Sequence, residues 1–283
     1  MKKALSYLKT ALKILLFTVK WLLLGYAIIF SIAGTIALYL GYQFVITPIR
    51  QVKYLQDNNP RESVYMTRYR EATHGRDTLQ QAFVPLDSIS KFLRDAVLAA
   101  EDDGFYTHPG IDIEAILTAM KYNRERNSIK RGASTITQQL AKNMFLTGEK
   151  SFDRKYRELM YTLLMEKYLG KKRILELYLN YAQWGKAIFG CEAAARCYYK
   201  KSCKNLTRSE AARLAAVLAM PSKVSPLNEN STFIGRRMAV IANNLLLHHL
   251  IDDSGYTALT GNPPPFRDSG DTGPGRPGPQ DID

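Results

Sequence analysis

An uncharged apolar run near the N-terminus is the strongest constraint on how this chain can fold. Residues 21–46 contain no Asp, Glu, Lys, Arg or His. About 20 apolar residues in a helix span the hydrocarbon core of a bilayer, whereas the apolar part of a cleaved signal peptide has about 7–15 residues. The run therefore predicts a retained transmembrane helix over 21–46, although Ala33 and Ala37 leave cleavage as an alternative.

The charges on either side of this run predict its orientation. Residues 1–20 carry five Lys and no acid, whereas only Arg50 and Lys53 follow the run closely. The positive-inside rule then places the N-terminal segment in the cytoplasm and everything after residue 47 outside it. Residues 21–251 carry +12 of charge within a chain total of +13, so we expect a polyanionic partner. A phosphorylated lipid or the membrane surface fits this location, whereas a nucleic acid would require the inverted topology.

The rest of the chain has a helical pattern. A connector of residues 47–86 includes a stretch at 64–69 that favours a strand, and apolar residues then recur at helical spacing. Eight helices are expected, beginning near residues 89, 112, 135, 153, 170, 192, 207 and 231. The fold class is therefore all-α over residues 87–251. Residues 252–283, with six Pro, six Gly and six Asp, are expected to be a disordered acidic tail.

Three cysteines recur at intervals of six residues, at Cys191, Cys197 and Cys203. A location outside the cytoplasm permits disulfides, and an odd number of cysteines leaves at least one unpaired. Buried thiols and a bridge between Cys197 and Cys203 around a short loop are both compatible with this spacing. No metal site is expected, because no two cysteines are close enough for a Cys-x-x-Cys clip and the four His are remote from them.

Three acids end the first expected helix, Glu101, Asp102 and Asp103, and an aromatic Phe105 and a His108 follow in a turn. Acids near a helix C-terminus oppose the helix dipole. The segment is therefore either an ordinary exposed helix end or a site where a carboxylate accepts a proton from a sugar hydroxyl.

The third expected helix has an unusually polar start over residues 132–139, led by Gly132. A helix N-terminus offers free backbone N–H groups and favours an anion. Gln139, Lys142 and Asn143 are spaced i, i+3, i+4, so they share one helix face that could hold a pyrophosphate. A well-capped surface helix is the alternative.

Two later helices combine cations and carboxylates. Arg154 and Lys155 precede Glu158 by one turn, as a surface ion pair or as fixed cations for a leaving phosphate would. Glu176 and Asn180 also share a helix face, where local pairing explains them at least as well as catalysis does.

Together and in this order, these segments resemble the five motifs of the peptidoglycan glycosyltransferase family, the transglycosylase domain of penicillin-binding proteins. The motifs are Glu101-Asp-x-x-Phe-x-x-His108-x-Gly110, Gly132-x-Ser-Thr-x-Thr-Gln-Gln139, Arg154-Lys-x-x-Glu158, Ile174-Leu-Glu-x-Tyr-Leu-Asn180 and Glu210-Ala-Ala-x-Leu-Ala-Ala-x-x-x-x-Pro221. The resemblance covers residues 80–250. Because no transpeptidase domain is recognised, the chain resembles the monofunctional branch.

The resemblance implies a lysozyme-like helical fold with a membrane-hugging lobe. It implies polymerisation of lipid II, a disaccharide-pentapeptide on undecaprenyl pyrophosphate, with inversion to a β-1,4 link. The implied location is the inner membrane of a bacterium, with a periplasmic catalytic domain. The implied partners are lipid II, the nascent glycan strand, the membrane, and cell-wall synthases or divisome proteins, with no nucleic acid. No cofactor is required, although a divalent cation such as Mg or Mn is expected to stimulate the reaction.

Mapped by motif position, the resemblance implies that Glu101 is the catalytic base and Glu158 a second essential carboxylate. The residues implied to bind substrate or shape its site are Asp102, Phe105, His108, Ser134, Thr135, Gln139, Lys142, Asn143, Arg154 and Lys155. Supporting roles are implied for Gly132, Glu176 and Asn180. Two rivals stay open. A lytic transglycosylase has no need of the cluster of cations, and a catalytically silent membrane scaffold has no need of the two Glu.

Overall fold

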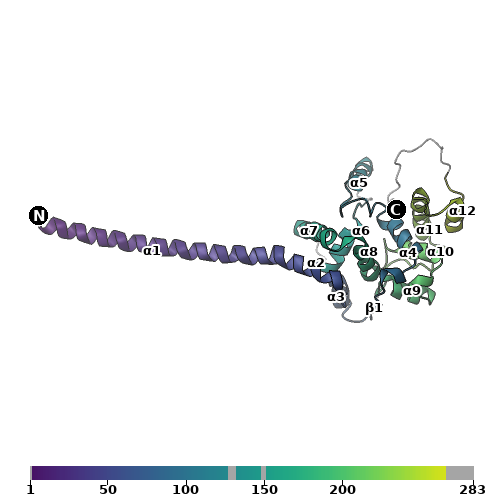
Figure 1. Cartoon of the computed structure of the whole chain (residues 1–283), viewed down its shortest axis with the longest axis horizontal. Coiled ribbons are helices and arrows are strands. Elements are labelled where there is room, and N and C mark those ends of the chain that lie inside the picture. The colour runs from purple at the N-terminus through teal and green to yellow at the C-terminus, as the bar shows by residue number, and fades with distance from the viewer. Residues whose placement is uncertain (1, 127–131, 148–150, 266–283) are drawn as a thin grey trace. The chain divides into compact units, whose positions relative to one another are not determined.

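The computed structural model describes residues 2–126, 132–147 and 151–265, and nearly all of its regular structure is helical (Figure 1). The helices are α1 (Lys2–Gly41), α2 (Thr47–Asp57), α3 (Val64–Ala72), α4 (Lys91–Glu101), α5 (Ile113–Glu125), α6 (Ile136–Phe145), α7 (Phe152–Tyr168), α8 (Gly170–Tyr181), α9 (Cys191–Tyr199), α10 (Arg208–Val217), α11 (Thr232–Leu247) and α12 (Asp253–Thr260). The single turns are a π turn, η1 (Tyr42–Ile46), and two 3-10 turns, η2 (Leu86–Ser88) and η3 (Cys203–Asn205). The all-α fold class is thus confirmed.

A small sheet accompanies the helices. Its strands are β1 (Gln80–Gln81), β2 (Gln183–Gly185) and β3 (Ile188–Phe189), in the order β1-β3-β2. Strand β3 pairs parallel to β1 and antiparallel to β2.

The apolar run lies within a longer helical segment. Helix α1 extends back through the Lys-rich N-terminal segment, and η1 continues the chain into α2. The helical conformation predicted over residues 21–46 is present and extends in both directions, and the segment is long and apolar enough to cross a bilayer. The chain divides into two compact units, residues 1–51 and 52–283.

All eight helices expected in the main domain are present, as α4 to α11. Capping side chains mark several of their first turns. The side chain of Asp112 accepts a backbone hydrogen bond at the start of α5, as an N-cap residue does. Thr135 and Gln138 form a reciprocal capping box at α6, and Thr207 and Glu210 form another at α10, as their spacing predicts.

The segment expected to be a connector instead contributes helices to the domain core. Residues 64–69, expected to favour a strand, belong to α3, which Ser63 caps and Met66 anchors in the core. Val52 and Leu55 of α2 are buried in the same core. A good N-cap and a buried apolar side chain therefore outweigh the weak β propensity of this stretch.

The start of the expected disordered tail is also helical. Asp252 caps α12 by accepting a hydrogen bond from the backbone N–H of Gly255, and Tyr256 and Leu259 are buried against the core. Two apolar residues one turn apart are enough to dock a helix this short. The tail from residue 266 onward lies outside the described residues.

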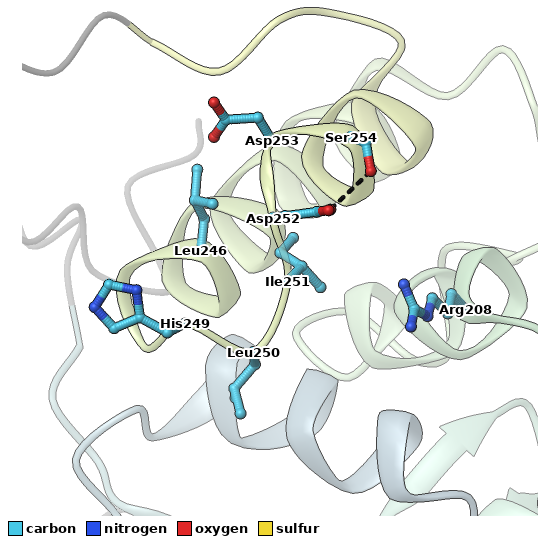
Figure 2. A pocket seen from close by; sticks show the side chains of 8 residues that line it. All are labelled: Arg208, Leu246, His249, Leu250, Ile251, Asp252, Asp253 and Ser254. Carbon is cyan, nitrogen blue, oxygen red and sulfur yellow. Dashed lines mark hydrogen bonds between the residues drawn. The ribbon is translucent and has the colours of Figure 1, made fainter.

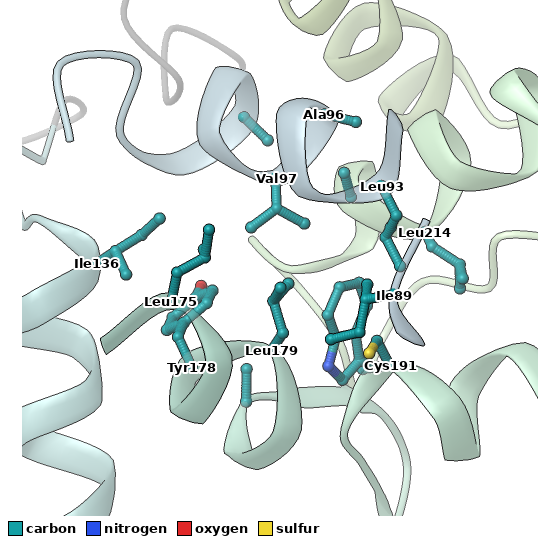
Figure 3. Packing of buried hydrophobic residues seen from close by; sticks show 14 of the residues in the cluster. Ile89, Leu93, Ala96, Val97, Ile136, Leu175, Tyr178, Leu179, Cys191 and Leu214 are labelled. Carbon is teal, nitrogen blue, oxygen red and sulfur yellow. The ribbon is translucent and has the colours of Figure 1, made fainter. Parts of the chain in front are cut away.

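Helix α4 lies at the centre of the domain core. It packs against α10 and α11, and its Leu93 and Val97 are fully buried. Leu175 and Leu179 of α8 approach it from the other side (Figure 3). Because the apolar face of α4 is enclosed in this way, the residue at its C-terminal end, Glu101, is held by the core.

Candidate active site

The carboxylate of Glu101 is held by side chains from two other helices, and a third helix holds one of these side chains in turn. The residue is only 9% exposed. Its Oε1 accepts a hydrogen bond from Nη2 of Arg237 at 2.8 Å, and its Oε2 accepts one from Nε2 of Gln139 at 3.0 Å. The Tyr178 hydroxyl donates to Oε1 of Gln139 at 3.1 Å. Burial, together with the charges of Glu101 and Asp102, raises the pKa of Tyr178 well above its ordinary value, so its hydroxyl remains a donor.

Asp102 joins the end of α4 to the start of α6. Its Oδ2 accepts a hydrogen bond at 2.9 Å from the backbone N–H of Ile136, at a helix N-terminus that favours negative charge. Its Oδ1 lies 2.8 Å from Nε2 of His108. The backbone N–H of Gly110 donates to Nδ1 of His108 at 3.1 Å, so Nε2 carries a proton and donates to Asp102. Asp102 and His108 therefore tie the loop after α4 to α6.

An ion pair supports the same loop. Nζ of Lys171 donates to Oε1 of Glu166 at 2.8 Å and to the carbonyl oxygen of His108 at 2.8 Å. It also lies 4.5 Å from the centre of the Phe105 ring, in cation–π contact. Oγ1 of Thr137 donates to the same Glu166 oxygen at 2.6 Å. Because Phe105 is fully buried among these groups, it shapes the loop from inside the protein.

Gly110 is the position in this loop where we expect substitution to be most harmful. Its φ of +93° lies in the left-handed region, and a Cβ there would lie 2.7 Å from Cγ of Glu166 and 2.8 Å from Cγ2 of Thr162. We expect Gly110→Ala to lower the free energy of unfolding by about 2–3 kcal/mol in urea denaturation. Gly104→Ala is the matched control, since its Cβ would approach no atom closer than 3.4 Å. Equal losses in the two variants would contradict this account.

The start of α6 divides the predicted polar residues into two groups. Thr135 is buried, and its hydroxyl donates to the carbonyl oxygen of Gly110 at 2.7 Å while accepting from the backbone N–H of Gln138. Gly132 and Ser134 are exposed. Ser134 is therefore open to a ligand, whereas the hydroxyl of Thr135 holds the loop and caps the helix.

The predicted face of α6 points toward the Glu101 carboxylate at one end. Gln139 contacts Glu101, as described above. One turn further, Lys142 is exposed and Asn143 is half-buried. This face therefore runs from a buried carboxylate to an ammonium group that reaches solvent.

Lys142 lies within electrostatic reach of both predicted catalytic carboxylates. Desolvation by surrounding protein atoms lowers its pKa below the ordinary value of 10.5. The charge of Glu158 opposes this shift, those of Arg154 and Lys155 add to it, and that of Glu101 opposes it. Charged groups of both α4 and α7 therefore act on this ammonium group.

Glu158 is buried on α7 between two cations. Its Oε1 accepts a hydrogen bond from Nζ of Lys155 at 2.5 Å, and its Oε2 accepts one from Nη1 of Arg154 at 3.3 Å. Lys142 interacts electrostatically with the same carboxylate, so the three cations and Glu158 together carry a formal charge of about +2. Such a cluster favours a dianionic group.

Glu176 and Asn180 hold the segment that leads into α4. Oε1 of Glu176 accepts a hydrogen bond from the backbone N–H of Leu86 at 2.8 Å. The Asn180 amide exchanges two hydrogen bonds of 2.9 Å with the backbone of Val84. Both side chains therefore brace the segment that leads into α4.

Arg237 is the member of this site that sequence reasoning missed. It is 1% exposed on α11 and contacts Glu101 from 136 positions away in the chain. A signal was available, because Ile234, Met238 and Ile241 mark the apolar face of this helix and position 237 falls on it. A charge on an apolar helix face requires a buried partner.

The structure shows the first of the two alternatives for the cysteines. All three are free thiols, and no bridge joins Cys197 to Cys203. Sγ of Cys197 donates to Oε1 of Gln80 at 2.5 Å, whereas Cys191 and Cys203 are fully buried. Six residues correspond to about 600° of helical rotation, so Cys191 and Cys197 lie on different faces of α9.

A surface pocket of about 750 Å³ is formed by the start of α10, the end of α11 and the start of α12 (Figure 2). Its lining includes Arg208, His249 and Asp252, and none of the predicted site residues. Asp252 accepts a hydrogen bond from Oγ of Ser254 at 2.8 Å and caps α12, so it has a structural role. Within residues 2–126, 132–147 and 151–265, no three His, Cys, Asp or Glu side chains form a metal-binding group.

The similarity to known proteins covers the same part of the chain. A family model described as Transglycosylase matches residues 68–245, from α3 to α11. The chain is 45% identical over 194 residues to a biosynthetic peptidoglycan transglycosylase of Thiobacillus denitrificans, covering 68% of this chain and 83% of that protein. It is 42% identical over 234 residues to a protein of the same name from Ralstonia nicotianae, covering 80% and 96% respectively.

Proposed function

Since the chain belongs to the transglycosylase family and is a peptidoglycan glycosyltransferase, we propose that it polymerises glycan strands with lipid II as its substrate and without transpeptidase activity. The donor is the growing strand, whose terminal sugar carries undecaprenyl pyrophosphate at C1. The acceptor is the 4-hydroxyl of the GlcNAc of lipid II. Glu101 takes the proton of this hydroxyl as its oxygen attacks C1. The C1–pyrophosphate bond breaks, C1 inverts and a β-1,4 link forms.

One observation supports this proposal: the α6 face that holds the Glu101 carboxylate through Gln139 also carries Lys142, which interacts electrostatically with Glu101 and with the group of Arg154, Lys155 and Glu158. Departure of a pyrophosphate develops negative charge, and cations fixed in advance stabilise that charge. A buried base at one end of the α6 face and about +2 of charge at the other suit a hydroxyl and a pyrophosphate respectively. A leaving group that is a sugar oxygen would not require the cations.

Two further polar residues have substrate roles in this scheme. Ser134, which is exposed, and Asn143, which follows Lys142 in α6, bind the donor or its pyrophosphate. Asp102 and His108 keep the loop after α4 in place around Glu101. No cofactor is required in this scheme, because the cations of the chain balance the pyrophosphate. Stimulation by Mg or Mn is part of the proposal, with the phosphates of the substrate as the natural ligands.

We place the enzyme in the bacterial inner membrane, with α1 spanning it, the N-terminus in the cytoplasm and the catalytic domain in the periplasm. The five Lys before the apolar run support this orientation. Large apolar side chains are exposed on α5 and α7 and support contact with lipid. These side chains are Ile113, Leu117, Met120, Phe152, Tyr156 and Leu163. The partners in this scheme are lipid II, the nascent strand, and cell-wall synthases or divisome proteins.

In the test, the purified full-length protein in detergent is incubated with two substrates separately. We expect labelled lipid II to be converted into a polymer and intact peptidoglycan sacculi to remain undigested. Release of small muropeptides from sacculi would identify a lytic enzyme. No reaction with either substrate, with or without Mg or Mn, would favour the silent scaffold.

The lowered pKa of Lys142 predicts an early loss of activity at alkaline pH. The cationic form is needed for the pyrophosphate, and kcat/KM reports the pKa of the free enzyme. We therefore expect kcat/KM to fall with rising pH at a value below 10.5, as Lys142 deprotonates. Lys142→Arg keeps the cation and should move this fall to higher pH. Lys121→Arg on the exposed part of α5 is the control, and an identical profile for all three proteins would contradict the assignment.

A further inference from the structure

Two of the three cysteines lie against each other in the core. Cys191 opens α9 and Cys203 opens η3, and both are fully buried (Figure 3 shows Cys191 among its apolar neighbours). A side-chain hydrogen bond links their thiols, and Sγ of Cys203 also donates to the carbonyl oxygen of Ser88 at 3.7 Å. Oε2 of Glu192 accepts hydrogen bonds from the backbone N–H of Cys203 at 2.8 Å and from Oγ of Ser202 at 3.0 Å. Glu192 directly follows Cys191 in the chain, and its carboxylate therefore holds the backbone of Cys203 close to the start of α9.

Glu192 keeps this clamp ionised at neutral pH. Desolvation raises its pKa, but hydrogen bonds from Cys203, Ser202 and Arg196 outweigh that effect and leave the pKa below its ordinary value. A depressed carboxyl pKa contributes stability above the pKa of the unfolded chain, and this stability is lost as the pH falls through the folded-state pKa. Near pH 7 the backbone of Cys203 is thus held by a charged side chain that accepts hydrogen bonds at both of its oxygens.

Neither buried thiol has a role in the proposed reaction. Burial and the contact with Cys203 raise the pKa of the Cys191 thiol well above its ordinary value, so it is a poor nucleophile and a poor metal ligand in the folded protein. Cys197 is half-buried and contacts Gln80 instead. Two buried thiols that are in contact with each other, have no part in the reaction and lie beside a clamped backbone are favourably placed to form a structural disulfide.

We propose that Cys191 and Cys203 form a disulfide in the mature protein and that Cys197 stays a free thiol. The proposal rests on the periplasmic location proposed above, because a disulfide persists in an oxidising compartment. The oxidant is a protein of the dithiol–disulfide class. A thiolate of the chain attacks its disulfide, and the second cysteine then displaces it from the mixed disulfide. The oxidant leaves as a dithiol that has taken two electrons and two protons, and the step precedes burial of the two sulfurs.

The sequence makes the test direct, because trypsin separates the three cysteines. Cleavage after Lys186, Arg196, Lys200, Lys201 and Lys204 leaves each cysteine in its own peptide. Full-length protein from membranes is denatured with an alkylating reagent present, digested without reductant and examined by mass spectrometry. We expect residues 187–196 linked to residues 202–204, and the peptide 197–200 alkylated. Three alkylated peptides, or a link that includes the peptide 197–200, would overturn the proposal.

Proteolysis of the same cells after removal of the outer membrane reports where the domain lies. Three free thiols in a domain that protease reaches would overturn the disulfide alone, whereas a protected domain would show that the topology had failed as well. Cys191→Ala and Cys203→Ala should each free the other thiol. Each should also lower Tm by about 5–10 °C, because the disulfide no longer closes the loop of residues 191–203 in the unfolded chain. Cys197→Ala is the matched control and should leave both the linked peptide and Tm unchanged.

Discussion

Glu101→Gln is expected to slow lipid II polymerisation by about 10²–10⁴-fold while the chain remains folded. The amide cannot accept the proton of the acceptor hydroxyl. Its amide oxygen still accepts a hydrogen bond from Arg237. If the side-chain amide of Gln139 rotates by 180°, its oxygen accepts from the new amide nitrogen and its nitrogen donates to the hydroxyl of Tyr178. The measurement is the initial rate of polymer formation by purified full-length protein, with Tm recorded beside it.

Asp103→Asn is the matched control for this result. It removes the charge of an acid two positions away, which lies 3.7 Å from His248 and has no part in the proposed reaction. Its rate should stay within about threefold of the unchanged protein, the range expected for a charge outside the reacting groups. Equal losses at the two positions would mean that the rate reports the general charge of this helix end and not a base. A Glu101→Gln protein that still polymerised at full rate would remove Glu101 from its role.

Arg237→Met is expected to have the largest effect on stability. It leaves the buried carboxylate of Glu101 without its cation, and breaking a buried pair in this way costs about 3–5 kcal/mol. For a domain of this size that is a fall in Tm of roughly 10 °C. Activity should fall as well, because Gln139 alone would then hold Glu101. Urea denaturation and polymerisation rates on the same preparation measure both effects.

Arg236→Met is the control one position away, on the exposed side of α11, and should change stability by less than about 0.5 kcal/mol. The double variant Arg237→Met with Glu101→Gln separates charge pairing from packing. It leaves no buried charge at either position, so it should be more stable than Arg237→Met alone and still inactive. Additive losses in the double variant would show that the two side chains do not depend on each other.

The sequence predicted the helices of the domain because its signals there are local. The capping boxes at Thr135 and Thr207 and the apolar periodicity of α4 each lie within one helix, and so does the ion pair of Arg154 with Glu158. The common face of Gln139 and Lys142 follows from spacing alone. Roles inside the site rested on the family resemblance, and they stay predictions that the variants above can test.

The features that were missed depend on contacts between distant parts of the chain. The contact of Arg237 with Glu101 joins α11 to α4, and that of Cys203 with Cys191 joins η3 to α9. Helix α12 begins in a segment of Pro, Gly and Asp, where composition indicates disorder and only docking of two side chains favours a helix. Local pattern carries no information on such pairings, since tertiary packing decides them.

The stoichiometry of the reaction tests the central claim most directly. Purified full-length protein is incubated with lipid II labelled in both sugar and lipid, and new glycosidic bonds and free undecaprenyl pyrophosphate are counted together. We predict one pyrophosphate released for each bond formed, and a polymer that a muramidase specific for β-1,4 links degrades completely. Bonds without equivalent pyrophosphate release, a polymer that resists the muramidase, or lipid II left unchanged by folded protein would contradict the account.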